Sequence, residues 1–231
     1  MGVLEHSLLK KTPLFASLND ADLRKLAAVC QRRHFRAGGV VFYEEDPADH
    51  LFVVESGEIK VTMLGDGERE VILSIFGPGE CFGELALLDE APRSATVVAT
   101  ADTSVLAIAR DDFHKVLLAN PAIALHLLKV LAQRLRRSTH RIESLVLLDV
   151  FGRVARLLLE MARDQGEKQP DGSLAFPRPT QQDLASMVGS SRETVSRVIK
   201  ELSTAGLIRA QGRKYFIYPE LYHGKKREMP H

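Results

Sequence analysis

Apolar residues follow two different periodicities along this chain of 231 residues. Leu23, Leu26 and Ala27 recur at helical spacing after Asn19 or Asp20 as a cap, which predicts a helix over 17–33. From residue 38 onward, short apolar runs alternate with turns rich in glycine and proline. These runs cover residues 40–43, 51–55, 59–63, 71–75, 95–99 and 105–109. Short strands at regular spacing with turns between them predict an all-β roll or barrel.

A long segment without glycine or proline follows Pro121 and runs to Phe151. Apolar residues recur in it at spacings of three and four, in a heptad pattern. The seam consists of Leu128, Leu131, Leu135, Ser138, Ile142 and Leu145. Such a narrow stripe predicts a dimerisation helix on a two-fold axis, with a core helix lying on the roll as the alternative. Asp149 and Gly152 interrupt the pattern and predict a hinge.

The remaining residues predict a small mixed domain. We expect helices over 151–163, 181–187 and 192–205, a polar loop over 164–172, a short strand near 174–176, a hairpin over 207–218 and a frayed basic tail at 225–227. The fold class is therefore α+β. The predicted domains are a β-roll of the jelly-roll or double-stranded β-helix type (1–120), a dimerisation helix and hinge (121–149), and a winged helix-turn-helix (150–231).

Charge divides along the same lines. Residues 1–149 carry a net charge of −4 and residues 150–231 a net charge of +5, which favours an anionic partner such as nucleic acid for the C-terminal part. With only Cys30 and Cys81, the chain does not hold a disulfide framework, a cysteine-rich zinc module or a four-cysteine iron–sulfur cluster. No apolar stretch reaches the ~18 residues of a membrane span, and the first residues lack a signal-peptide core. We expect a cytoplasmic protein.

The segment 180–202 has the pattern of a helix-turn-helix. Thr180 precedes the first helix as an N-cap, Gly189 allows a sharp turn, and Ser191 caps the second helix. On that helix, polar side chains take the outward positions. An arginine there grips guanine, and a glutamate accepts a hydrogen bond from cytosine, as in a major-groove reader. The alternative is an ordinary surface helix with charged caps.

A second constellation lies between two predicted strands, over residues 79–97. Gly83-Glu84-Leu85 begins a turn of helix whose free N–H groups suit an anion, and Arg93 and Ser94 add donors. Glu84 repels a bare phosphate but accepts a hydrogen bond from a sugar hydroxyl. The cassette therefore suggests a phosphate joined to a ribose, and the alternative is an Arg93–Glu84 salt bridge closing a loop.

The heptad seam contains one polar position. Ser138 stands where an apolar residue is expected, beside Thr139. A hydroxyl in a seam fixes helix register or bonds a ligand lodged against the roll, and we favour the ligand.

Together these motifs resemble the Crp/Fnr family of bacterial transcription regulators, and within it the cyclic-AMP receptors. The resemblance runs from Leu14 to Tyr218 and rests on the cassette, the hinge residues 148–153 and the helix at 189–197. It implies a homodimer that binds cyclic AMP in the roll and a palindromic TGTGA-like operator, contacts RNA polymerase, and is not an enzyme. The implied ligand residues are Gly83, Glu84, Leu85, Arg93, Ser94, Ala95, Arg134, Ser138 and Thr139. The implied DNA residues are Thr180, Gln181, Ser190, Ser191, Arg192, Glu193, Thr194, Ser196, Arg197 and Lys200.

Several alternatives stay open within the resemblance. The order Ser138-Thr139 reverses the usual threonine-then-serine pair of the cyclic-AMP receptors. Some family members bind cyclic di-GMP, and the extra arginines it needs are present at 136, 137 and 141, which otherwise form a solvated basic face. Histidines allow a haem branch, which the intact cassette argues against. The cysteines do not support an oxygen-sensing cluster, and no metal is expected. A nucleotide hydrolase and a cyclic-nucleotide regulatory subunit that binds a protein partner are the functions of other classes.

Overall fold

The computed structural model describes residues 2–65 and 69–218. The chain divides into two compact units, Met1–Arg136 and Arg137–His231, with the division inside the long helix α5 (Pro121–Leu147). The predicted boundaries at 120 and 149 remain predictions. The tail at 225–227 lies outside the described residues.

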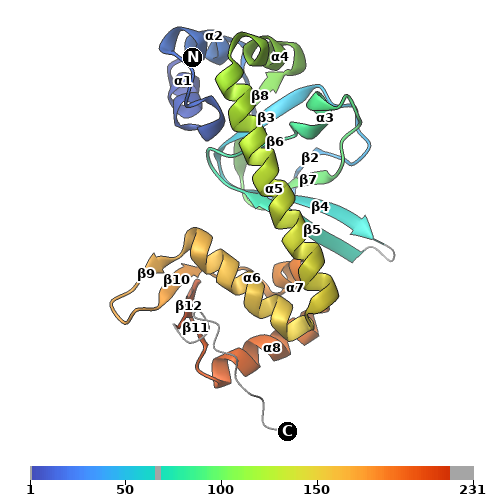
Figure 1. The fold of residues 1–231 in the computed structure, drawn as a ribbon, viewed down its shortest axis with the longest axis vertical. Coiled ribbons are helices and arrows are strands. Elements are labelled where there is room, and N and C mark those ends of the chain that lie inside the picture. Colours follow the sequence, from blue (N-terminus) through green and yellow to red (C-terminus); the bar gives the residue numbers. More distant parts are fainter. Residues whose placement is uncertain (1, 66–68, 219–231) are drawn as a thin grey trace. The chain divides into compact units, whose positions relative to one another are not determined.

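The first unit contains two four-stranded antiparallel sheets that face each other as a roll (Figure 1). One sheet has the strand order β1-β8-β3-β6 and the other the order β2-β7-β4-β5. The strands are β1 (Gln31–Phe35), β2 (Val40–Phe42), β3 (His50–Ser56), β4 (Ile59–Gly65), β5 (Arg69–Phe76), β6 (Cys81–Phe82), β7 (Thr96–Ala99) and β8 (Thr103–Ala109). The predicted β-roll is confirmed, and β1 and β6 are additions to it.

Alternating apolar residues of both sheets fill the space between them. Phe52 on β3 and Phe82 on β6 stack with ring centroids 5.2 Å apart, and Ile59 and Val97 add buried side chains from the facing sheet. Since successive strand residues point to opposite faces, every second residue of these apolar runs enters this core.

Helices gather at one end of this roll (Figure 1). They are α1 (Gly2–Lys11), the short 3₁₀ helix η1 (Pro13–Phe15), α2 (Asp20–Val29) and α4 (Arg110–Ala119). Phe15, Leu26, Phe113 and Ile123 pack with the outward face of the β3–β8 sheet to form a second core of this unit.

The predicted helix over 17–33 is wrong at its C-terminal end. Asn19 caps α2 by accepting from the Asp22 N–H, but the helix ends at Val29 and Cys30 is already extended. Residues 31–35 form β1 and pair with β8. Tertiary pairing decides the structure here, because β1 is polar and carries no apolar alternation of its own.

A polar network joins α1 to the roll. Glu55 accepts hydrogen bonds from both ends of the Arg32 guanidinium, each at 2.8 Å, and from the Ser104 hydroxyl at 2.6 Å. The carboxylate of Glu5 on α1 lies 3.2 Å from the same guanidinium. This network holds a helix that the apolar pattern alone did not predict.

Helix α5 ends at Leu147, earlier than the apolar pattern suggested. Asp149 starts a new helix, α6 (Val150–Gln165), because its side chain accepts from the Gly152 N–H at 2.8 Å. Gly152 therefore lies in the first turn of α6. The break predicted at 149–152 falls on residues 148 and 149.

The second unit places three short helices around a small sheet of strand order β11-β12-β10-β9. After α6 come β9 (Glu167–Lys168), β10 (Leu174–Pro177), α7 (Gln181–Val188), α8 (Arg192–Thr204), β11 (Ile208–Gln211) and β12 (Lys214–Ile217). Leu158, Phe176, Leu184, Leu202 and Tyr215 are fully buried in its core. The winged helix-turn-helix is confirmed, with β9 as an addition.

Within residues 2–65 and 69–218, no single helix is long and apolar enough to cross a membrane. The bent pair α4 and α5 meets the length and composition test only when taken together.

Candidate functional site

The cassette follows β6 and turns tightly at Gly83. Its φ of 79° is in the left-handed region, and a Cβ at this position would lie 2.8 Å from an Arg93 terminal nitrogen. Only glycine therefore lets the backbone approach that guanidinium. The helical turn α3 (Leu85–Leu88) follows, as the sequence predicted.

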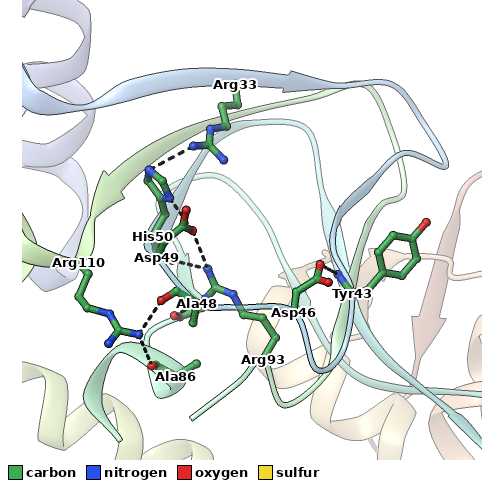
Figure 2. A network of polar contacts seen from close by, with 10 residues as sticks. Arg33, Tyr43, Asp46, Ala48, Asp49, His50, Ala86, Arg93 and Arg110 are labelled. Carbon is green, nitrogen blue, oxygen red and sulfur yellow. Dashed lines mark hydrogen bonds and ion pairs between the residues drawn. The ribbon is translucent and has the colours of Figure 1, made fainter. Parts of the chain in front are cut away.

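Arg93 is the centre of the cassette although its side chain is only 3% exposed. Its guanidinium donates to the Gly83 carbonyl and to the His50 carbonyl, each at 2.8 Å, and lies 4.2 Å from the centre of the Phe42 ring. Figure 2 shows it reaching toward Asp49 and His50 at the start of β3. Among the described residues, Arg93 Nε has no hydrogen-bond partner.

Burial lowers the pKa of the Arg93 guanidinium below its ordinary value, while the carboxylates around it act in the opposite direction. An arginine stays protonated even so. A buried cation with an unused donor is a receptor for an anion, because buried polar groups are normally hydrogen-bonded. The residues present therefore fit a phosphate group.

Glu84 does not pair with Arg93, which was the alternative to a binding cassette. Its carboxylate, 3% exposed, lies 2.5 Å from the guanidinium of Arg134 on α5, so no Arg93–Glu84 bridge closes the loop. Arg134 also donates to the Cys81 carbonyl at 2.7 Å and lies 4.6 Å from the Phe76 ring centre. The predicted residues Glu84 and Arg134 are thus brought together.

The other predicted ligand residues lie in two places. Ala95 is buried beside Arg93, while Ser94 and Leu85 are exposed on the cassette surface. Ser138 and Thr139 lie on the part of α5 that belongs to the second unit, and both are exposed.

Sequence reasoning missed the polar groups behind Arg93. Asp49 Oδ1 lies 4.0 Å from its guanidinium and 2.7 Å from the Nδ1 of His50 (Figure 2). Arg110 on α4 donates to the carbonyls of Ala48 at 2.6 Å and Ala86 at 3.3 Å, which ties α3 to the start of β3. The only signal in the sequence is a polar run directly before an apolar strand.

The second predicted site has the geometry of a helix-turn-helix. Thr180 accepts from the Asp183 N–H at 3.0 Å, and Ser191 accepts from the Thr194 N–H at 3.2 Å, so both predicted caps are present. Gly189 has a φ of 65°, which closes α7 in the left-handed conformation that glycine favours.

Helix α8 separates its faces as predicted. Val195, Val198, Ile199 and Leu202 are buried. The polar side chains on the other face are exposed or half-buried, and they are those of Arg192, Glu193, Thr194, Ser196, Arg197 and Lys200. Ser196 is half-buried because its hydroxyl bonds to the Gln181 side chain of α7. Thr180 is exposed, and Gln181 and Ser190 are half-buried near the start of each helix.

The hairpin and the residue that follows β10 add cations to which sequence reasoning gave no role in binding DNA. Arg209 lies over the ring of Phe216 at 4.7 Å, and Arg178 over that of Tyr215 at 5.2 Å. Lys214 pairs with Glu167 of β9 at 2.8 Å. Aromatic stacking of this kind leaves the guanidinium edges available to phosphates.

Most of the seam of α5 is exposed within the single chain, whereas Leu131 is half-buried and packs against the core of the roll. Leu128, Leu135, Ile142 and Leu145 are between 55% and 68% exposed. Neighbouring apolar residues increase this surface, with Val146 at 75% and Leu147 at 71% exposed. An apolar stripe of this length is typical of a surface that a second copy covers.

Within the described ranges, no group of three His, Cys, Asp or Glu side chains lies close enough to hold a metal ion. Both cysteines are free thiols, and burial raises the pKa of Cys30 and of Cys81 to about 12.

Comparison with known proteins matches the N-terminal and C-terminal parts of the chain to two different domain families. Residues 32–120 match the cyclic nucleotide-binding domain, and residues 152–220 match the Crp-like helix-turn-helix domain. The chain is 32% identical to the CRP-like cAMP-activated global transcriptional regulator of Mycobacterium tuberculosis, covering 91% of this chain and 94% of that relative. It is 37% identical to the cyclic AMP receptor protein of Thermus thermophilus, covering 87% and 90%.

A solved structure adds a third likeness. The c-di-GMP-responsive global regulator CLP of Xanthomonas campestris superimposes with a TM-score of 0.72 at 27% identity, covering 87% of this chain and 99% of that one.

Proposed function

This chain belongs to the Crp/Fnr family of DNA-binding transcription regulators with a nucleotide-binding domain, and we propose that its ligand is cyclic AMP. The observation that carries this proposal is Arg93. Its guanidinium is 3% exposed and its Nε has no partner among the described residues. A single phosphodiester anion supplies that partner. We propose that Gly83, Leu85, Ser94 and Ala95, the other cassette residues, also contact this phosphate.

Glu84 receives the ribose hydroxyl in this proposal. A carboxylate held by Arg134 at 2.5 Å is fixed in place and keeps lone pairs for a hydroxyl donor. Ser138 and Thr139 then face the base and carry the signal. Because Ser138-Thr139 reverses the threonine-then-serine order of the cyclic-AMP receptors, base selectivity is tested with several nucleotides rather than with cyclic AMP alone.

We propose that the functional unit is a homodimer joined along α5. Ligand binding shifts the population of dimers toward one in which two α8 helices match major grooves about 34 Å apart. The ligand must favour that state by a coupling free energy of typically ~1–3 kcal/mol. The break at residues 148 and 149 is the hinge of this change.

The DNA target is a palindrome with TGTGA-like half-sites. Arg192, Glu193 and Arg197 are exposed on α8 and read base edges. Residues at the caps of α7 and α8, with Lys200, position the protein on phosphates. Such a target implies the cytoplasm as its location and RNA polymerase as a further partner.

Cyclic di-GMP is the second candidate ligand. The likeness to the Xanthomonas regulator favours it, together with three arginines on α5 at 136, 137 and 141. Arg137 lies 3.6 Å from Asp164, and burial lowers the pKa of Arg141. These contacts use two of the three arginines within the protein, so we rank cyclic AMP first.

The experiment is a titration of the protein onto a fluorescent palindromic duplex, followed by anisotropy at fixed salt. It is repeated with cyclic AMP, cyclic GMP and cyclic di-GMP. Tighter binding with cyclic AMP alone supports the proposal. Weaker DNA binding in the presence of cyclic di-GMP would make cyclic di-GMP the ligand instead. DNA binding that none of the three nucleotides changes would refute a roll that responds to a nucleotide.

Two variants separate the sites. Arg93→Ala should abolish the ligand response and leave basal DNA binding, whereas Arg24→Ala, an exposed charge on α2, should change neither. Arg192→Ala should weaken the free energy of operator binding by roughly 1–3 kcal/mol and relax sequence specificity at one base pair. A loss that is uniform across sequences would make Arg192 a phosphate contact instead.

A further inference from the structure

Arg93 joins two segments of the roll that are far apart in the sequence. Its guanidinium donates to the His50 carbonyl and to the Gly83 carbonyl, each at 2.8 Å. His50 begins β3, and Gly83 follows β6. The place of this guanidinium, and of the Nε that lacks a partner among the described residues, therefore depends on how these two segments are held relative to each other.

A second arginine joins the same two segments. From the first residue of α4, the Arg110 guanidinium donates to the Ala48 carbonyl at 2.6 Å and to the Ala86 carbonyl at 3.3 Å (Figure 2). Ala48 lies two residues before His50, and Ala86 lies three residues after Gly83. One terminal nitrogen of Arg110 makes both bonds, so it fixes the separation of the two carbonyls.

His114 adds a third contact one helical turn further along α4. Its Nε2 lies 3.0 Å from the Leu87 carbonyl, and because a carbonyl only accepts, Nε2 is the donor. The last carbonyls of a helix have no partners in its own backbone, and Ala86 and Leu87 lie in the four-residue helix α3. Helix α4 therefore supplies donors to carbonyls of the cassette helix.

Helix α4 is a firm support for these contacts. Residues four apart lie on the same face of a helix, so Arg110 and His114 reach the same neighbour. Phe113 is fully buried, in a core that also contains Leu87 of α3. Moving α3 away from α4 would therefore disturb buried apolar contacts and hydrogen bonds together.

The charge of Arg110 also acts on Arg93. Burial lowers the pKa of the Arg93 guanidinium, and the charge of Arg110 lowers it further, while nearby carboxylates raise it. The two guanidiniums therefore repel each other. An anion bound at Arg93 offsets this repulsion, so Arg110 favours an anionic ligand without touching it.

We propose that Arg110 and His114 are positioning residues of the ligand cassette. They hold helix α3 and the segment before β3 at the separation that keeps both carbonyl partners of Arg93 within reach, and Arg110 adds a positive charge nearby. The ligand phosphate then meets a guanidinium that is already in place, so less ordering opposes its binding. This inference rests on the proposed function, because it takes the cassette ligand to be cyclic AMP.

The test is calorimetric titration of the full-length protein with cyclic AMP, with one disruptive and one conservative variant at each position. Arg110→Met removes the donor and the charge, and it should weaken cyclic AMP binding about tenfold or more. Arg110→Lys keeps a charged donor and should restore most of the wild-type affinity. His114→Leu should weaken binding about three- to tenfold, whereas His114→Gln keeps an N–H donor and should restore it.

Lys115→Met is the matched control, because Lys115 is a cation of the same helix that is 75% exposed and pairs with Asp112. This variant should keep wild-type affinity. Thermal unfolding followed by circular dichroism checks that each variant is folded at the temperature of the titration. If Arg110→Met does not fold, the two His114 variants carry the test.

The outcomes separate this inference from the proposed function. Wild-type affinity in folded Arg110→Met and His114→Leu would overturn the inference, and the cassette assignment would stand if Arg93→Ala had lost binding. Weaker binding that the conservative variants do not restore would also overturn it, since lost packing would then explain the effect. If wild type does not bind cyclic AMP, both proposals fail.

Discussion

Replacing Gly83 by alanine tests how closely the cassette backbone is fitted around Arg93. At Gly83 the new methyl group would lie 2.8 Å from Arg93 and 3.4 Å from Phe52 and the His50 carbonyl. Gly79 offers a control in the same cassette. Its φ of 86° is similar, but a methyl group there would meet nothing within 4 Å.

The two substitutions share one cost and differ in another. A non-glycine residue in the left-handed region costs roughly 1–2 kcal/mol, which applies at both positions. At Gly83 the guanidinium must also move. It is buried and hydrogen-bonded to the Gly83 carbonyl at 2.8 Å, and losing a charged hydrogen bond costs about 1.5–3 kcal/mol. We therefore expect Gly83→Ala to lower the free energy of unfolding by about 2.5–5 kcal/mol and Gly79→Ala by about 1–2 kcal/mol.

Displacement of the Arg93 guanidinium in Gly83→Ala should also weaken ligand binding. A loss of one charge-assisted contact corresponds to about 10- to 100-fold weaker cyclic AMP binding in Gly83→Ala. Gly79→Ala should keep wild-type affinity. Urea unfolding of the roll and calorimetric titration measure the two quantities. Equal destabilisation and equal affinity in both variants would refute the reasoning, because backbone strain alone would then account for the glycine.

Three further predictions concern other parts of the chain. Because burial raises the pKa of Cys30 and Cys81 to about 12, both thiols should react roughly a thousandfold more slowly than an unfolded control with a disulfide reagent at pH 8, and fast labelling of either would contradict this. Ile142→Glu places two charges in the proposed seam and should weaken the dimer at least about a hundredfold by sedimentation, whereas an unchanged dimer would place the interface elsewhere. Burial raises the pKa of Glu55, but its hydroxyl and guanidinium partners lower it below the ordinary value, so its stabilisation is present above the unfolded pKa of about 4.3 and is lost as the pH falls through the folded pKa. Glu55→Gln should therefore flatten the fall in melting temperature between pH 5 and pH 3, and an unaltered acid limb would argue against this linkage.

Local chemistry explains which parts of the fold were predictable. Thr180, Gly189 and Ser191 act on their own backbone neighbours, so their residue types alone predict two capped helices and a sharp turn. The strands β3 and β8 are apolar on both faces because each face covers a core, so their runs of apolar residues are themselves a local signal. By contrast, β1 is polar and depends on β8, more than 60 residues away along the chain, so no local signal marks it.

The candidate site shows the same limit. The residue type of Arg93 predicts an anion site and that of Glu84 a sugar hydroxyl beside it, but the partners of both side chains come from distant segments. Arg134 lies 50 residues after Glu84, and His50 lies 43 residues before Arg93. Pairing of this kind is decided by how the sheets and α5 pack, and a single sequence does not contain it.

The buried charges of the cassette connect stability with function. Arg93 and Glu84 are each 3% exposed, and taking charged groups out of water costs free energy that their contacts only partly return. The unpartnered Nε of Arg93 is part of that cost. In our proposal, a bound phosphate supplies the partner that Arg93 Nε lacks among the described residues, and a sugar hydroxyl donates to Glu84 beside its contact with Arg134. By linkage, we expect binding of such a ligand to stabilise the roll, because it would supply a partner to a buried cation that is incompletely hydrogen-bonded without it.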